Sequence, residues 1–239
     1  MNSNIQVFQI DVKVYLLKDI RYIDSLYTLG CFLNKALSLN EQTLELHTKK
    51  EFKGYCFNNL VPLECDKVYK EGKVYTFSIR TIKKELAEHF AKVLPDVTTN
   101  EMKGLVANST FIPKRPIEKL YSITYCIIKT DFGYWKKNKS LDEFEKRVND
   151  NCDKKYQYFT GNKERRERKF YHHLQFLNKK VIAMNYKNIS LLGDKIELCI
   201  DADEEAQDMA YMLLGVGLCE NNANGGGYVN YKGIEVNDR

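Results

Sequence analysis

Residues 215–228 of the chain read GVGLCENNANGGGY and contain five of its 13 glycines. The segment before them, 201–214, has the apolar spacing of a helix, with Asp201 as the expected N-cap and Glu204 as its capping-box partner. The segment after them, 227–236, is expected to be a strand. Rossmann and P-loop sites need the opposite order, because the N-terminus of the following helix must face the phosphate. The order helix, glycine loop, strand therefore excludes both kinds of nucleotide site.

The rest of the second half of the chain places this loop in a repeating order of elements. The patterns predict a strand at 119–131, a helix at 140–159 and two strands within 179–201 around a turn near residues 192–194. With the helix and strand that flank the glycines, the order is β-α-β-β-α-β, that of a ferredoxin-like unit. The extra segment 160–180 is expected to be helical for much of its length.

The first half of the chain has the same order of elements. Its first strand alternates, with Phe8, Ile10, Val12, Val14 and Leu16 on one face. Pro113 and Pro116 separate the halves, so we expect an α+β protein of two tandem ferredoxin-like units, at 1–114 and 115–239. The elements predicted for the first unit are a strand at 8–16, a helix at 20–37 capped by Asp19, strands at 53–62 and 73–82, a helix at 83–94 and a strand at 103–112.

Composition and charge are those of a globular, mildly basic protein. The 239 residues are 44% hydrophobic and carry a net charge of +5, which suits an anionic partner without requiring one. The seven cysteines form no C-x-x-C pair, so we expect reduced thiols and a cytoplasmic location. No apolar run is long enough for a membrane span, and no metal-binding motif is visible.

The glycine-rich loop and the element order resemble one protein family. Gly215-Val216-Gly217, the spacer LCENNAN and Gly225-Gly226-Gly227 precede a hydrophobic strand in the second ferredoxin-like unit. This resembles the CRISPR-associated endoribonucleases of the RAMP superfamily, which cut precursor CRISPR RNA within its repeats. Their loop commonly has a basic residue in the spacer, whereas this spacer has none and contains Glu220.

The resemblance also implies catalytic residues. The family often places a histidine between the first helix and the second strand, with a lysine nearby, and His47 and Lys53 occupy those places. Some members use a tyrosine on the first helix; Tyr27 is the candidate here, although Phe32 lies nearer the expected spacing. Close rivals of Lys53 are Lys49 and Lys50, and the other histidines, which are expected to have other roles, are His89, His172 and His173.

The implied reaction needs neither a metal nor another cofactor. The ribose 2′-hydroxyl attacks the adjacent phosphorus, leaving 5′-hydroxyl and 2′,3′-cyclic phosphate ends. A histidine, with an ordinary pKa of about 6.5, suits the proton transfers, and a lysine suits the charge that develops on phosphorus. The sequence leaves open whether His47 is the acid or the base.

Three groups of residues are candidates for RNA contact. The glycines would let an RNA phosphate approach main-chain N–H groups. The basic segment 163–169 would add positive charge, although such runs are usually solvated helix faces, and the residues between the two units could line a cleft. The candidates are Gly215, Gly217, Gly225 and Gly227; Lys163, Arg165, Arg166, Arg168 and Lys169; and Lys114 and Arg115.

The sequence supports a first reading and two alternatives. The first is an endoribonuclease whose partner is CRISPR repeat RNA, alone, as a homodimer or with other CRISPR effector subunits. The second is a non-catalytic RAMP subunit that binds guide RNA and has no need of His47. The third is a ferredoxin-like protein with some other ligand, for which the basic segment would be irrelevant.

Overall fold

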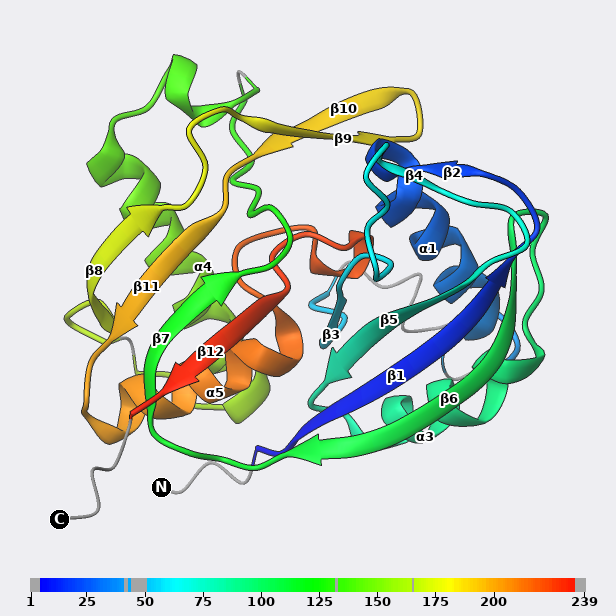
Figure 1. Cartoon of the computed structure of the whole chain (residues 1–239). Helices are drawn as coiled ribbons and strands as arrows, with labels where there is room; N and C mark the ends of the chain where they lie inside the picture. The colour runs from blue at the N-terminus through cyan, green and yellow to red at the C-terminus, as the bar shows by residue number, and fades with distance from the viewer. Residues whose placement is uncertain (1–4, 41–42, 44–50, 132, 165, 235–239) are drawn as a thin grey trace, which may run out of the picture.

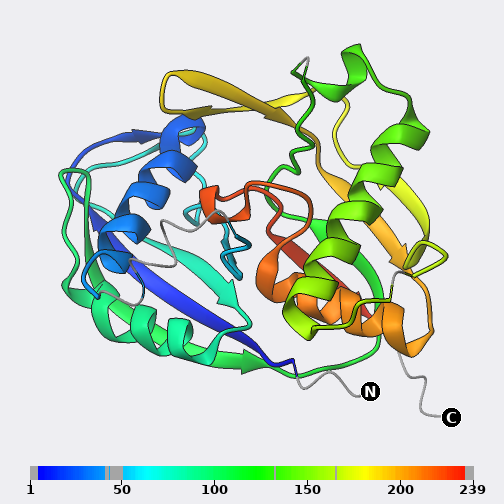
Figure 2. The ribbon, with the colours of Figure 1, turned by 180° about the vertical axis from the view of Figure 1, so that it is seen from behind.

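The computed structural model describes residues 5–40, 43, 51–131, 133–164 and 166–234. Two four-stranded sheets lie side by side, with the helices on one face of both, as Figures 1 and 2 show from opposite sides. The first unit contains β1 (Val7–Leu16), β2 (Ile20–Arg21), α1 (Tyr22–Leu37), β3 (Tyr55–Phe57), β4 (Val68–Tyr69), β5 (Val74–Thr81), α3 (Lys84–Val93), η1 (Leu94–Asp96) and β6 (Met102–Ile112), and its β2 and β4 pair separately from the main sheet. The second unit contains β7 (Ile117–Ser122), η2 (Trp135–Lys137), α4 (Leu141–Thr160), β8 (Tyr171–Phe176), β9 (Ile182–Tyr186), β10 (Ile189–Gly193), β11 (Ile196–Ile200), α5 (Glu204–Val216), η3 (Asn222–Asn224) and β12 (Val229–Gly233), and its β9 and β10 pair separately from the main sheet.

The first sheet has the strand order β3-β5-β1-β6, and all neighbours are antiparallel. The alternation of β1 decides which face is covered. Ile10, Val12 and Val14 are fully buried in a core shared with α1 and α3, whereas Lys13 points to the exposed face. The predicted first strand is confirmed, and it lies at the centre of its sheet.

The second sheet has the order β12-β7-β11-β8, again antiparallel throughout. In both sheets the last strand of the unit lies beside the first, followed by the third and then the second of the four. Helices α4 and α5 cover one face of the second sheet and enclose its core. The expected pair of tandem ferredoxin-like units is therefore confirmed.

The helix predicted within 160–180 is wrong. Residues 171–176 form β8, which pairs with β11. The side chains of Tyr171, its first residue, and of Phe170, just before it, are buried. The charged residues before them, which resembled one face of a helix, are tied down by ion pairs described below. Charged residues at helical spacing do not establish a helix when they pair with residues from other parts of the fold.

Both predicted N-cap residues, Asp19 and Asp201, are wrong. Helix α5 is capped by Asp203, not Asp201, because the Asp203 side chain accepts a hydrogen bond from the Ala206 N–H at 3.1 Å. Helix α1 begins at Tyr22, and Asp19 does not cap it. Instead, its carboxylate accepts a hydrogen bond from the Glu71 N–H at 2.8 Å, in the turn that follows β4.

A hairpin of β9 and β10 extends from the second unit to the first (Figure 1). The sequence predicted two strands within 179–201, and the structure has three, of which only β11 joins the main sheet. The hairpin packs on α1: the rings of Tyr27 and Tyr186 meet edge to face at 5.6 Å, and Asn185 donates to Asp24 at 2.7 Å. The hairpin therefore holds the outer ends of the two units together.

Buried contacts also join the two units at their centre. The Arg80 guanidinium, on β5, donates to the carbonyl of Val229 at 2.7 Å and lies 4.6 Å from the centre of the Tyr228 ring. The Tyr211 hydroxyl donates to the carbonyl of Ile112 at 2.5 Å. All seven cysteines are free thiols, as expected. Within the described ranges, no helix has both the length and the apolar character needed to cross a membrane.

Candidate nucleic-acid interface

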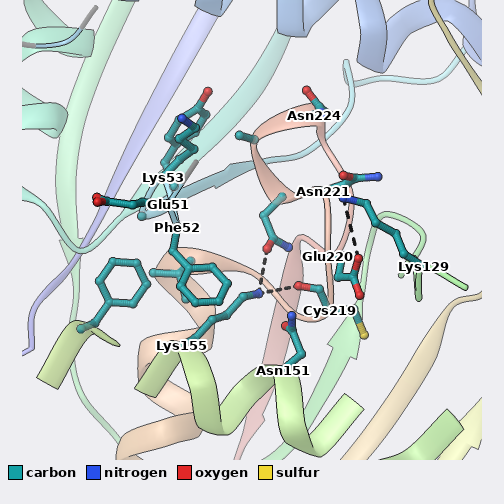
Figure 3. A pocket seen from close by; sticks show the side chains of 16 residues that line it. Glu51, Phe52, Lys53, Lys129, Asn151, Lys155, Cys219, Glu220, Asn221 and Asn224 are labelled. Atoms are coloured by element: carbon teal, nitrogen blue, oxygen red, sulfur yellow. Dashed lines mark hydrogen bonds and ion pairs between the residues drawn. The ribbon is translucent and has the colours of Figure 1, made fainter. Parts of the chain in front are cut away.

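A cavity of about 420 Å³ lies where the two units meet, beneath the glycine-rich loop (Figure 3). Its walls come from the segment before β3, from α4 and from the loop between α5 and β12. The described residues that line it are Glu51, Phe52, Lys53, Gly54, Tyr55, Lys129, Asn151, Lys155, Phe159, Val216, Cys219, Glu220, Asn221, Asn222, Ala223 and Asn224. The cavity thus brings together the two segments in which the family resemblance was found.

Lys155 on α4 supports the loop from inside. Its side chain is buried, and its ammonium donates to the carbonyls of Gly217 and Cys219 at 2.7 and 2.6 Å and to Asn222 Oδ1 at 2.7 Å. Burial lowers the pKa of Lys155, but three oxygens at this distance match the three donors of an ammonium. The spacer has no basic residue of its own, and Lys155 from α4 supplies a positive charge that holds the loop by hydrogen bonds.

Sequence reasoning missed Lys155. The residue follows another lysine in the run CDKKYQYF and reads as part of a solvated face. The available signal was its spacing, three residues after Cys152 and four before Phe159, which places it on the apolar side of α4. Its neighbour Lys154 is the exposed member of the pair.

The glycines of the loop fit close backbone packing. A Cβ on Gly227 would lie 1.8 Å from the carbonyl oxygen of Leu218, and the backbone there has φ of +66°. The N–H groups of Gly217, Gly225 and Gly227 donate to carbonyls within the protein, and Gly215 packs against Ile82. An RNA phosphate could reach these N–H groups only if the loop opened, so RNA contact by the four glycines stays a prediction.

Alanine at Gly227 is expected to destabilise the folded chain by about 2–3 kcal/mol, from left-handed strain and the clash with Leu218. Urea unfolding of the Gly227→Ala variant would measure the loss. Gly161→Ala is a matched control, since Gly161 also has a positive φ, +73°, but no atom lies within 4 Å of its Cβ position. Equal losses in the two variants would contradict a packing role for Gly227.

Of the three predicted catalytic residues, the structure describes Lys53 and Tyr27, and only Lys53 lines the cavity. Lys53 lines the cavity, and its pKa is lowered mainly by burial, with Glu51 raising it and Lys83 lowering it further. Tyr27 is not among the described residues of the lining, because its ring packs on Tyr186 of the hairpin. His47 lies outside the described residues, as do its neighbours Lys49 and Lys50.

The basic segment 163–169 is not a free basic face. Arg166 is only 6% exposed and forms two hydrogen bonds of 2.5 Å with the Asp203 carboxylate. Arg168 lies 3.0 Å from the same carboxylate, and Lys169 pairs with Glu145. These partners correct the expectation of an exposed helix, because the segment is tied to the start of α5.

The other predicted RNA contacts are dispersed. Lys163 and Arg115 are exposed, and Lys114 pairs with the buried Asp208, whereas Arg165 lies outside the described residues. None of the five basic residues predicted in 163–169, and neither Lys114 nor Arg115, is among the described residues that line the cavity. RNA contact by these residues stays a prediction.

Replacing Arg166 by methionine is expected to cost about 2 kcal/mol at neutral pH, because Asp203 would lose a buried partner. Arg166 holds the pKa of Asp203 well below its ordinary value in the folded chain. Ionised Asp203 therefore stabilises the fold above about pH 4, and this contribution is lost as the pH falls below that value. Urea unfolding at pH 7 and pH 3 should show a smaller pH dependence in Arg166→Met than in the wild type. An unchanged dependence would rule out this pairing.

Comparison with known proteins finds a similar sequence family and similar folds. Residues 122–231 match the sequence family described as CRISPR associated protein Cas6, C-terminal. No curated protein matches the chain in sequence.

Solved structures match the whole chain in fold. A CRISPR associated protein Cas6 is 21% identical, with a TM-score of 0.68 over 96% of this chain and 100% of that one. A RAMP protein described as binding different RNA substrates is 16% identical, with a TM-score of 0.69 over 94% and 99%. The product of a Cas6-related gene from Pyrococcus furiosus is 15% identical, with a TM-score of 0.68 over 95% and 98%. Residues 122–231 are thus similar in sequence to the C-terminal part of Cas6 proteins, and both units share the fold of these Cas6 and RAMP structures.

Proposed function

We propose that the chain is a metal-independent endoribonuclease that cuts precursor CRISPR RNA within its repeats. In this reaction the 2′-oxygen forms a bond to the adjacent phosphorus while the bond from phosphorus to the 5′-oxygen breaks. A base takes the proton of the 2′-hydroxyl, and an acid gives a proton to the leaving 5′-oxygen. The products are a 2′,3′-cyclic phosphate and a 5′-hydroxyl.

One observation carries the proposal: Lys53 lines the same cavity as the glycine-rich loop, between the two units. A partly buried ammonium interacts more strongly with developing negative charge than one in water. Lys53 would therefore stabilise the charge that builds up on the phosphoryl oxygens.

His47 is the proposed proton-transfer residue. It precedes Glu51, a residue of the cavity wall, by four positions. An imidazole that titrates near neutrality can serve either proton step.

RNA is the proposed partner, with further CRISPR proteins beside it. A Cas6 from Thermus thermophilus has been solved as a product complex. Another similar chain, of which this one covers 47%, belongs to a partial Cas6-RT-Cas1–Cas2 complex. A cytoplasmic location, where thiols stay reduced, would suit the seven free cysteines.

The experiment is cleavage of repeat-containing RNA in EDTA, with a ribose or a 2′-deoxyribose at the scissile nucleotide. We expect cleavage of the ribose substrate, with 5′-hydroxyl and cyclic phosphate ends, and none of the 2′-deoxy substrate. Cleavage that survives the 2′-deoxy substitution would refute the mechanism. Tight binding of the RNA without cleavage would instead assign the chain to the non-catalytic, RNA-binding RAMP subunits.

A further inference from the structure

The charges of the cavity largely offset one another. Lys53 and Lys129 bring two positive charges to its lining, and Glu51 and Glu220 bring two negative ones. The Lys129 ammonium lies 3.8 Å from the Glu220 carboxylate. The ammonium of Lys155 is already surrounded by loop oxygens. This interior suits a neutral polar group better than it suits a phosphate.

An amide oxygen without a hydrogen-bond partner lies in the wall of the same cavity. Asn151 projects from α4 toward the loop (Figure 3), and its Oδ1 is buried without a hydrogen-bond partner in the described part of the chain. Asn221, held at φ of 60°, adds a second amide to the lining. Each side-chain amide offers two donors and two lone pairs, and burying such groups unpaired is costly. The site therefore fits a ligand that has both donors and acceptors on one edge.

Aromatic rings form another part of the lining. Phe52, Tyr55 and Phe159 come from the first unit and from α4, and the centres of the Phe52 and Phe159 rings lie 6.2 Å apart at 45°. Flat nucleobases stack on such rings when RNA is single-stranded. A ring system with a polar edge would satisfy both the aromatic and the amide parts of the lining.

Lys53 lies on the boundary between this cavity and a smaller hollow of about 130 Å³. The two share Lys53, Tyr55, Ala223 and Asn224, and the second is completed by Asn34, Leu37 and Leu86. A cation between two adjoining hollows has the arrangement needed to contact a phosphate whose two neighbouring nucleotides point to opposite sides.

We propose that the larger cavity binds the base of one unpaired nucleotide beside the scissile phosphate, and that Asn151 hydrogen-bonds the edge of that base. The inference rests on the proposed function and adds a determinant of sequence specificity to it. The base stacks on the aromatic rings, and its sugar–phosphate chain passes over Lys53. RNA with the preferred base at this position is bound and cut in preference to RNA with another base.

The test has a binding arm and a cleavage arm. In the first, 2-aminopurine is placed in turn at each nucleotide flanking the scissile position of uncut, 2′-deoxy RNA. We expect one position whose fluorescence falls on binding to the wild type and falls less with Asn151→Ala. In the second, RNAs randomised at that position compete for cleavage. We expect about a tenfold or greater preference for one base in the wild type, and near-equal use of all four with Asn151→Ala.

The control is Asn108→Ala, the same change at an exposed residue of β6, which should keep the wild-type preference. Asn221→Ala is a second test of the cavity if Asn151→Ala does not fold. A base preference that Asn151→Ala and Asn221→Ala leave unchanged overturns the proposal even if cleavage occurs. Binding with an Asn151-dependent preference but no cleavage supports it while refuting the nuclease. No binding of RNA overturns both.

Discussion

The Lys155→Met variant is expected to lose about 4–5 kcal/mol of unfolding free energy and most of its activity on RNA. Methionine fills a similar volume but donates no hydrogen bond. The carbonyls of Gly217 and Cys219 and the amide oxygen of Asn222 would then be buried without their shared donor. Each buried, unsatisfied acceptor costs about 1–3 kcal/mol, and removal of one partner from a buried charged network costs about 3–5 kcal/mol.

Urea unfolding measures the first effect, and cleavage of repeat RNA by the remaining folded protein measures the second. Lys154→Met is the matched control, since Lys154 is exposed on the same helix. It should change the unfolding free energy by less than about 0.5 kcal/mol. If both variants were equally stable, Lys155 would not be holding the loop.

The tandem fold could be predicted because its signals are local. The alternation of β1 and the order of helices and strands lie in short windows of sequence, and each window agrees with the sheet that forms. The glycine-rich loop is identified in the same way, by the helix before it and the strand after it. The predictions failed at residues whose structure is determined by contacts with residues distant in the sequence.

Segment 163–176 is an example of such an error. Its charges are spaced as on a helix, but Arg166 pairs with Asp203, 37 residues away, and the segment continues into β8. Lys155 binds oxygens 62 to 67 residues away, so its neighbours in the sequence do not reveal that it is buried. Tyr27 was assigned from its place on α1, whereas its partner Tyr186 comes from a hairpin of the other unit. Each of these contacts depends on chain topology, which no single window contains.

His47→Ala is expected to lower the rate of RNA cleavage by about 10²–10⁴-fold, the usual contribution of a positioned acid or base. RNA affinity should change little, because the proposed loss lies in proton transfer. Single-turnover cleavage in EDTA measures the rate, and binding of uncut 2′-deoxy RNA measures the affinity. The pH profile adds a separate readout: a wild-type limb near the ordinary histidine pKa of about 6.5 should disappear in the variant.

His89→Ala is the control for this prediction, because His89 already has a structural partner. Its Nε2 lies 3.0 Å from the carbonyl oxygen of Ala36, so it joins α3 to the end of α1. The control should cut RNA at nearly the wild-type rate even if it is somewhat less stable. If His47→Ala cuts as fast as the wild type, the proton-transfer role belongs elsewhere. If it cuts slowly only because it binds RNA weakly, His47 contacts the substrate without transferring a proton. Only a proton-transfer role produces all three results together: a lower cleavage rate, an unchanged RNA affinity and the loss of the histidine limb from the pH–rate profile.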